Sequence, residues 1–302
     1  MFQESAPELL AQWVHFMRQG DFAAAWKISD VAVRLGHNRD RRLPKHLQQV
    51  WDGGPLQGRR VLVRCYHGLG DTIQFIRFLP LLKTVAAEVI ASVPPRLVSL
   101  FSKSPEVSGL IWCQEVNTSI YEVEIELMEL PHFFRTTIEN IPPGVSYEIK
   151  PETFSDEGRL HVGLVWRAGD WNDRRSIPFE QLLPIFELPN LSFHILQQNA
   201  AEAGWREGLG QISGGYDILE DAQLLPALDL LITVDTMPAH LAGALGVPVW
   251  TLLRKESDWR WMTEREDTPW YPTMRLFRQL HDGDWKNVID RAVSQLNEEA
   301  EE

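Results

Sequence analysis

The pattern of apolar and polar positions predicts alternating strands and helices along most of the chain. It is clearest in residues 228–253, where an apolar run through Val234 is followed by the polar pair Asp235 and Thr236. A small-residue segment with apolar positions at helical spacing, a Gly-Val-Pro break and a second apolar run come next. Buried strand, polar turn, short helix and buried strand make a βαβ unit, so we predict a parallel sheet here.

Asp235 and Thr236 fall where the first strand of this βαβ unit ends and its helix begins. Open α/β sheets bind ligands at the carboxyl ends of their strands, and the N–H groups of a helix N-terminus favour an anion such as phosphate. His240 lies one helical turn further on. A buried, hydrogen-bonded histidine is the favoured interpretation, and donation to a phosphate oxygen is the alternative.

Residues 1–45 predict a helical hairpin. Apolar stripes run through residues 9–17 and 22–35, and Gly20 and Asp21 separate them. The sequence Gly-Asp-Phe-Ala-Ala-Ala-Trp at the second helix resembles a single tetratricopeptide-type repeat, and an ordinary helical cap is the alternative. One such unit cannot bury both of its faces. We therefore expect the hairpin to dock on the rest of the chain or on another copy, which would make a homo-oligomer.

Residues 46–150 predict a first α/β domain with strands at 60–66, 88–93, 109–112 and 122–127. The last of these reads as an edge strand with one solvated face, because charged and apolar residues alternate in it.

The loop after the first strand carries Gly68, Gly70 and Asp71, and we expect a helix from residue 73. Strand, Gly-x-Gly and helix indicate backbone that approaches a ligand, although the third glycine of the dinucleotide fingerprint is missing. Asp71 is either a helix cap or a general base, and the local sequence alone favours the cap.

Residues 151–302 predict a second α/β domain, after a Pro/Gly-rich boundary. Its first strand ends at Trp166, and the following polar loop contains Arg174 and Arg175. These arginines either neutralise a diphosphate or form exposed salt bridges. A further strand ends at Gln197.

The composition argues against several classes of function. The net charge of −13 argues against a nucleic-acid binder or a binder of anionic membranes, although local arginines can still hold an anionic ligand. Two cysteines cannot form a disulfide framework, and no histidine pair has metal-ligand spacing with a third ligand nearby, so we expect no metal site. No apolar run has membrane-spanning length and the amino terminus lacks a signal pattern, so we expect a cytoplasmic protein without an integral membrane segment.

Several segments occur in an order that resembles the heptosyltransferase-like glycosyltransferases, and most of all the glycosyltransferase module of bacterial tetratricopeptide-repeat proteins. Together they span most of residues 51–290. The matching segments are Trp51–Gly53, His67–Pro80, Val162–Trp166, Asn172–Pro178, Val234–Trp250, Asp258–Trp261 and Trp270–Gln279.

This resemblance implies a GT-B fold, in which two Rossmann-like parallel-sheet domains face each other across a cleft, here preceded by the helical hairpin. It implies a nucleotide-diphospho-sugar donor held mainly by the second domain, an acceptor held by the first, and neither a cofactor nor a catalytic metal. By position, Asp71 corresponds to the proposed general base. The residues expected at the donor are Gly68, Gly70, Trp166, Arg174, Arg175, Gln197, Asp235, Thr236, Met237 and His240.

The functional hypothesis is inverting, metal-independent glycosyl transfer to a protein or glycan acceptor. Met237 and Pro238 stand where the family usually has a small and then an aliphatic residue, and His67 stands where relatives often have glutamine. These differences motivate the alternative of a non-catalytic nucleotide-sugar sensor or assembly subunit. An epimerase of the same fold is a third reading.

Overall fold

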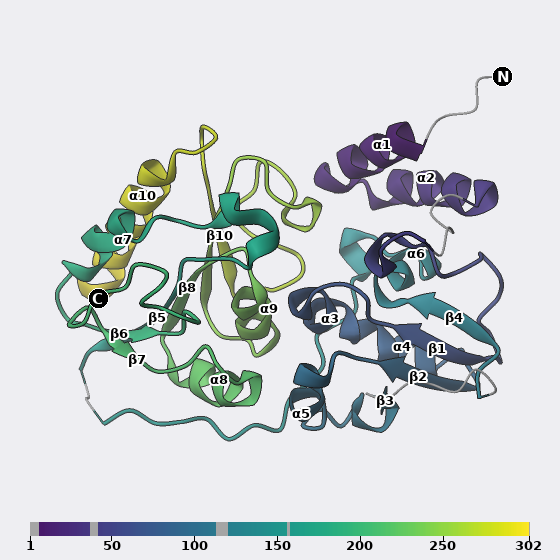
Figure 1. The fold of residues 1–302 in the computed structure, drawn as a ribbon, viewed down its shortest axis with the longest axis horizontal. Coiled ribbons are helices and arrows are strands. Elements are labelled where there is room, and N and C mark those ends of the chain that lie inside the picture. Colours follow the sequence, from purple (N-terminus) through teal and green to yellow (C-terminus); the bar gives the residue numbers. More distant parts are fainter. Residues whose placement is uncertain (1–5, 37–41, 113–119, 156–157, 302) are drawn as a thin grey trace. The chain divides into compact units, whose positions relative to one another are not determined.

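The structure is a computed structural model that describes residues 6–36, 42–112, 120–155 and 158–301. The chain divides into two compact units, each built on a parallel β-sheet (Figure 1). The first unit comprises Met1–Tyr147 with Asp258–Thr263, and the second comprises Glu148–Ser257 with Glu264–Glu302. The sequence placed the hairpin in a domain of its own and residues 258–263 within the second α/β domain. In the structure both segments pack in the first unit.

The first unit holds a four-stranded parallel sheet in the order β3-β2-β1-β4. Its strands are β1 (Arg60–Arg64), β2 (Glu88–Ser92), β3 (Ile111–Trp112) and β4 (Val123–Glu126). The strand order reverses between β1 and β4. In open α/β sheets such a switch point is where the ligand crevice forms, at the carboxyl ends of the two strands.

Short helices accompany this sheet. They are α3 (Leu69–Phe75), α4 (Leu79–Lys83), α5 (Val98–Phe101) and α6 (Leu130–Phe133). The sequence predicted a helix start at residue 73, but α3 begins four residues earlier and includes Gly70 and Asp71. The Asp71 carboxylate accepts the N–H of Gly68 at 2.9 Å, and so satisfies one of the donors that a first helical turn leaves without a partner.

Strand β4 lies at the sheet edge, as predicted, but the prediction of one solvated face fails at its end. The Glu124 side chain is 35% exposed, whereas that of Glu126 is 3% exposed. Glu126 turns inward because its carboxyl group caps the 3-10 turn that follows, accepting the N–H of Met128 at 2.6 Å.

The hairpin consists of α1 (Ala6–Arg18) and α2 (Phe22–Leu35), and it docks on the rest of the first unit. Trp26 donates its indole N–H to the carbonyl of Thr136 at 2.6 Å and stacks on His132 in α6. Asp30 accepts hydrogen bonds from His132 and Arg135. Of the two expectations for this hairpin, docking on its own chain is therefore confirmed, and assembly into a homo-oligomer stays a prediction.

The second unit holds a six-stranded parallel sheet in the order β10-β9-β8-β5-β6-β7. Its strands are β5 (Leu160–Val165), β6 (Leu191–Ile195), β7 (Gln211–Ile212), β8 (Leu230–Val234), β9 (Val249–Leu253) and β10 (Met274–Arg278). Strands β8 and β9 are buried along their whole length, as their unbroken apolar runs predict. The order reverses between β5 and β8, which gives this sheet its own switch point.

Four helices accompany this sheet: α7 (Phe179–Phe186), α8 (Ile218–Leu224), α9 (Met237–Ala244) and α10 (Trp285–Glu301). Figure 1 shows α7 and α10 on one side of the sheet and α8 and α9 on the other. Buried residues of α7 and α10 pack with those of β5 and β8 in one apolar cluster. The predicted βαβ unit is β8, α9 and β9, so its polar turn lies at the switch point.

Candidate functional site

The turn between β8 and α9 carries three of the predicted donor-site residues. Asp235 follows β8 directly and is 5% exposed, while Thr236 is the N-cap residue of α9 and Met237 its first residue. Thr236 has extended backbone angles and makes no side-chain cap bond. The amino end of α9 therefore lies at the carboxyl end of β8, which is the geometry that favours an anion.

Arg175 and Arg174 have different environments in the structure. Arg175 donates from Nη1 to the carbonyl oxygen of Asp235 at 2.7 Å, and the same nitrogen lies 3.7 Å from Asp235 Oδ2. Its side chain is 15% exposed, whereas Arg174 lies at the surface. Of the two arginines that the sequence offered for a phosphate, Arg175 is the one placed at the switch point.

Gln197 and Trp166 are buried and hold the loop that follows β5. The Gln197 side-chain oxygen accepts the N–H groups of Trp166 at 3.1 Å and Arg167 at 2.8 Å. Trp166 is 2% exposed, donates its indole N–H to the carbonyl of Ala203 and packs on Phe179. These bonds give both side chains a structural function, and their contact with a donor stays a prediction.

His240 adopts the buried, hydrogen-bonded state that the sequence favoured. It is 2% exposed, and its Nδ1 lies 3.0 Å from the hydroxyl of Tyr271. A Cβ atom on Gly243 would lie 2.6 Å from the Tyr271 ring, so a glycine is needed for α9 to pack this closely. The pair fixes α9 against the segment before β10.

The first unit has Asp71 at its own switch point, in the first turn of the helix α3 that follows β1. Its Oδ2 accepts a hydrogen bond from the N–H of Gly68, and its Oδ1 accepts one from Nη2 of Arg260 at 2.5 Å. The side chain is 20% exposed. Asp71 thus caps the first turn of α3 from its third position, while the N-cap residue is Gly68 and not Asp71, which the local sequence had favoured for that role. Gly68 and Gly70 both have φ values open to any residue.

Arg260 is a member of the site that the sequence did not identify. It belongs to the 3-10 turn Trp259–Trp261, and its side chain is 10% exposed. The Asp-Trp-Arg-Trp motif was visible in the sequence, but no local pattern pairs it with a residue 189 positions earlier.

Glu126 and His67 are two further titratable groups near Asp71. Glu126 Oε2 lies 3.9 Å from Nε2 of His67, at the carboxyl ends of β4 and β1. The pKa of Glu126 is raised to about 8, chiefly by burial and also by the neighbouring carboxylates Glu129 and Asp71, whereas backbone N–H donors oppose the shift. Burial also lowers the pKa of His67. Near neutral pH both groups are therefore uncharged.

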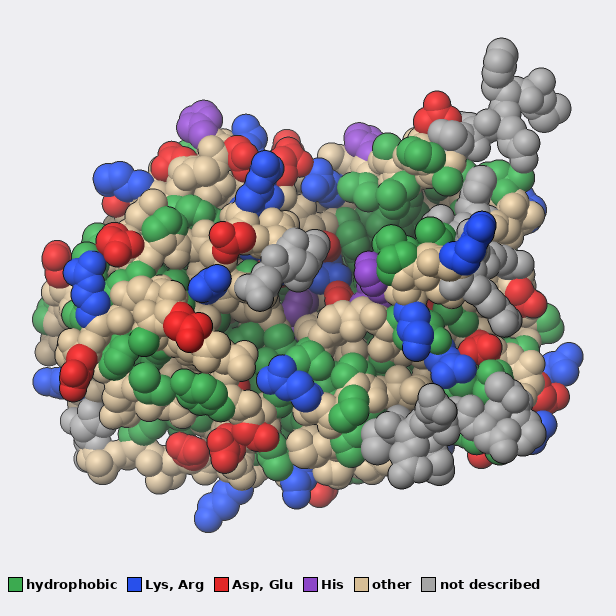
Figure 2. Space-filling view, in the orientation of Figure 1, with side chains coloured by type: hydrophobic (Ala, Val, Ile, Leu, Met, Phe, Trp, Pro, Cys, Tyr) green, Lys and Arg blue, Asp and Glu red, His purple; other side chains and the backbone are tan. Residues whose placement is uncertain are grey.

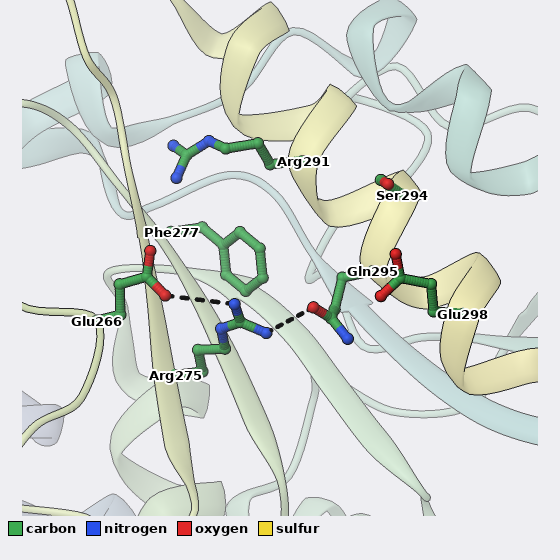
Figure 3. Close-up of a pocket in the computed structure, with 7 residues that line it drawn as sticks. All are labelled: Glu266, Arg275, Phe277, Arg291, Ser294, Gln295 and Glu298. Carbon is green, nitrogen blue, oxygen red and sulfur yellow. Dashed lines mark hydrogen bonds and ion pairs between the residues drawn. The ribbon is translucent and has the colours of Figure 1, made fainter. Parts of the chain in front are cut away.

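A small pocket of the second unit lies elsewhere (Figure 3). It has a volume of about 200 Å³, below the 300–1,000 Å³ usual for ligand pockets. Its lining comes from α10, from β10 and from the segment before β10, and Arg275 crosses it to contact Glu266 and Gln295. Arg275 stands at the amino-terminal half of β10, away from the carboxyl strand ends that carry Asp235. This pocket is not the candidate donor site.

The described ranges also bear on metal sites and membrane spans. They contain no group of three or more His, Cys, Asp or Glu side chains arranged to hold a metal ion. Among their helices, none combines the length and apolar composition that a bilayer span needs. Figure 2 shows acidic and basic side chains interspersed over the face in view.

Part of the second unit is similar to a known protein family. Residues 194–288 match glycosyltransferase family 9 (heptosyltransferase). The matched region contains β8, α9 and β9 with Asp235, Thr236 and His240. Over these residues the chain is similar to an enzyme family that transfers glycosyl groups.

A curated relative extends the likeness along the chain. Protein FlbA of Caulobacter vibrioides is 27% identical over 292 residues, which cover 82% of this chain and 48% of FlbA. The chain therefore spans about half the length of this relative.

Two solved structures show the fold. A family 9 glycosyl transferase from Veillonella parvula aligns with a TM-score of 0.58 at 14% identity, over 82% of this chain and 97% of that one. The ADP-heptose lipopolysaccharide heptosyltransferase II of Escherichia coli aligns with a TM-score of 0.51 at 13% identity, over 80% and 98%. The expected GT-B fold class is confirmed by these alignments.

Proposed function

We propose that this protein is an inverting, metal-independent glycosyltransferase that uses a nucleotide-diphospho-sugar and no cofactor. The second unit binds the donor, and the first unit supplies the general base. The resemblance to glycosyltransferase modules of tetratricopeptide-repeat proteins supports a protein or glycan acceptor. A cytoplasmic location is part of the proposal, and the acidic net charge argues against nucleic acid as a partner.

The observation that carries the proposal is the position of the charged residues in each sheet. Asp71 follows β1 at the switch point of the first sheet, and Arg175 meets Asp235 at the switch point of the second. These are the places where open α/β sheets bind ligands. A carboxylate on one sheet, and a guanidinium with a helix N-terminus on the other, are the parts that glycosyl transfer from a diphosphate requires.

In the proposed reaction the acceptor hydroxyl oxygen attacks the anomeric carbon of the sugar, on the face opposite the diphosphate. A carbon–oxygen bond forms to the acceptor while the bond to the diphosphate oxygen breaks, which inverts the configuration. Asp71 takes the proton of the acceptor hydroxyl. The leaving nucleoside diphosphate gains negative charge, which Arg175 and the amino end of α9 stabilise.

A second candidate is a non-catalytic nucleotide-sugar sensor or assembly subunit of the same fold. Pro238 lies in the first turn of α9, where it removes one N–H that would otherwise face an anion. Loss of that donor weakens the stabilisation of a leaving diphosphate more than it weakens binding as a whole, because the charge develops during transfer.

A ligand panel tests both candidates. The wild-type protein is heated with UDP, GDP, ADP and CDP and with their sugar conjugates, since a ligand of the native state alone raises the unfolding midpoint. Release of nucleoside diphosphate from each stabilising conjugate is then measured. Binding with release supports transfer, binding without release supports the sensor, and interconversion of the free nucleotide sugar would indicate an epimerase. If no nucleotide binds, both candidates are wrong.

Matched variants test the assigned residues. Arg175→Gln removes a charged donor at the switch point and should weaken binding of the stabilising nucleotide about tenfold or more. Arg174→Gln removes an equal charge from the same turn at the surface, and should leave binding within about twofold. Asp71→Asn should keep nucleotide binding and lower turnover by about 10²-fold or more. Equal losses in both arginine variants would contradict the role of Arg175.

A further inference from the structure

The segment Asp258–Thr263 leaves the second unit and returns to the first. Asp258 caps its 3-10 turn by accepting the N–H of Arg260 at 3.1 Å. At its other end, the N–H of Thr263 donates to the carbonyl of Arg18, the last residue of α1, at 3.0 Å. The segment is therefore anchored at both ends, and it brings Arg260 to a fixed place.

Arg260 holds the Asp71 carboxylate in one orientation. Nη2 lies 2.5 Å from Oδ1, while Gly68 donates to Oδ2, so each carboxylate oxygen accepts one bond from a rigid donor. The Arg260 side chain is 10% exposed and its Nε lies 3.3 Å from Asp258 Oδ1. Charge-assisted bonds of this kind are roughly twice as strong as neutral ones.

Aromatic side chains pack around Arg260. Its guanidinium lies 5.5 Å from the centre of the Trp259 ring. Trp259 packs edge-on against Trp13 of α1 at 5.3 Å and lies 6.2 Å from Phe75 of α3. Helix α3 also carries Asp71, so the two ends of the ion pair are tied to the same packed group.

We propose that Arg260 is the positioning residue of the general base, because it fixes the Asp71 carboxylate toward the acceptor hydroxyl. The inference rests on the proposed function and deepens it. An ion pair that only ties the segment to α3 is the alternative, and it would affect stability without affecting the reaction.

The pairing has a predictable effect on the pH dependence of turnover. A neighbouring guanidinium favours the ionised carboxylate and weakens it as a base, and removal of the guanidinium has the opposite effect. Other titratable groups near this site, among the described residues, are His67 with its neighbour His46, Glu126 with its neighbour Glu129, and Asp258 beside Arg260. The Arg260 substitutions change none of these residues.

The test uses the full chain and the donor identified by the panel, with kcat, donor KM and the pH profile of kcat measured. Arg260→Gln should lower kcat roughly 10- to 100-fold, leave donor KM within about threefold, and move the acid limb upward by about one pH unit or more. Arg260→Lys keeps the charge but not the planar fork, so it should restore part of kcat with the acid limb near its wild-type place. Arg265→Gln is the control, since Arg265 carries the same charge but belongs to the second unit, where it pairs with Asp267.

The outcomes distinguish the positioning role of Arg260 from the proposed glycosyl transfer. If wild type is active and Arg260→Gln matches Arg265→Gln in kcat and pH profile, the positioning role is wrong and the proposed transfer stands. If wild type releases no nucleoside diphosphate from any bound donor, both claims are wrong. If Arg260→Gln does not fold, Arg260→Lys decides: a kcat three- to tenfold below wild type supports the role, and an unchanged kcat overturns it.

Discussion

Replacement of Glu126 by glutamine tests the electrostatics of the first unit. The two residues have nearly the same shape, but glutamine does not ionise. Glu126 is 3% exposed and accepts the N–H groups of Met128 at 2.6 Å and Tyr66 at 3.3 Å. A glutamine offers one oxygen to these two donors, so we expect a cost of about 1–3 kcal/mol that does not vary with pH.

The pH-dependent part follows from the raised pKa of Glu126. Burial raises this pKa from 4.5 to about 8. At a pH between these two values the unfolded chain loses the proton and the folded protein keeps it, so the stability contributed by this group falls as pH rises. A pKa difference of one between the folded and unfolded states is worth 1.36 kcal/mol, so the whole difference amounts to about 5 kcal/mol. The contribution is full below pH 4.5 and is lost as the pH reaches about 8.

The assay is urea denaturation of wild type and Glu126→Gln at a series of pH values, with the free energy of unfolding obtained by linear extrapolation. The glutamine variant should be the less stable one near pH 4.5 and the more stable one near pH 8.5. Glu124→Gln is the matched control, since this half-buried residue of the same strand pairs with Arg64, and its effect should stay below about 1 kcal/mol. A difference between wild type and Glu126→Gln that stays constant across this range would refute the reasoning.

Three further substitutions test packing and backbone support. Gly243→Ala places a Cβ 2.6 Å from the Tyr271 ring and should lower the free energy of unfolding by about 1–3 kcal/mol. Trp26→Phe leaves the buried carbonyl of Thr136 without its indole donor and should cost about 1–3 kcal/mol, measured by urea denaturation. Gln197→Ala leaves two backbone N–H groups after β5 without their acceptor, and should lower both the unfolding midpoint and the affinity for nucleotide.

Much of the fold was predictable because apolar periodicity reports local burial. The unbroken apolar runs at β8 and β9 predicted buried parallel strands, and Asp235 fell at the predicted turn. The start of α3 was missed because Gly68, and not Asp71, is its N-cap residue, and the Asp71 side chain bonds back to the Gly68 N–H. Glu126 was misread because alternation describes a strand surface, whereas the turn after β4 draws that carboxyl group inward.

The site was less predictable than the fold. Arg175 pairs with Asp235, which lies 60 positions later in the chain, and Arg260 pairs with Asp71, which lies 189 positions earlier. No local period encodes such contacts, since they depend on how strands order themselves in a sheet. The sequence could name the charged residues, but it could not tell Arg175 from Arg174.

The return of residues 258–263 to the first unit has a consequence for how the protein is made. Domains usually fold in order as the chain emerges from the ribosome. Here the first unit lacks Arg260 until nearly all of the second unit's strands have been synthesised. A fragment ending at residue 147 would carry Asp71 without its partner. Protein synthesis therefore completes the environment of this carboxylate late, when β5 to β9 already exist.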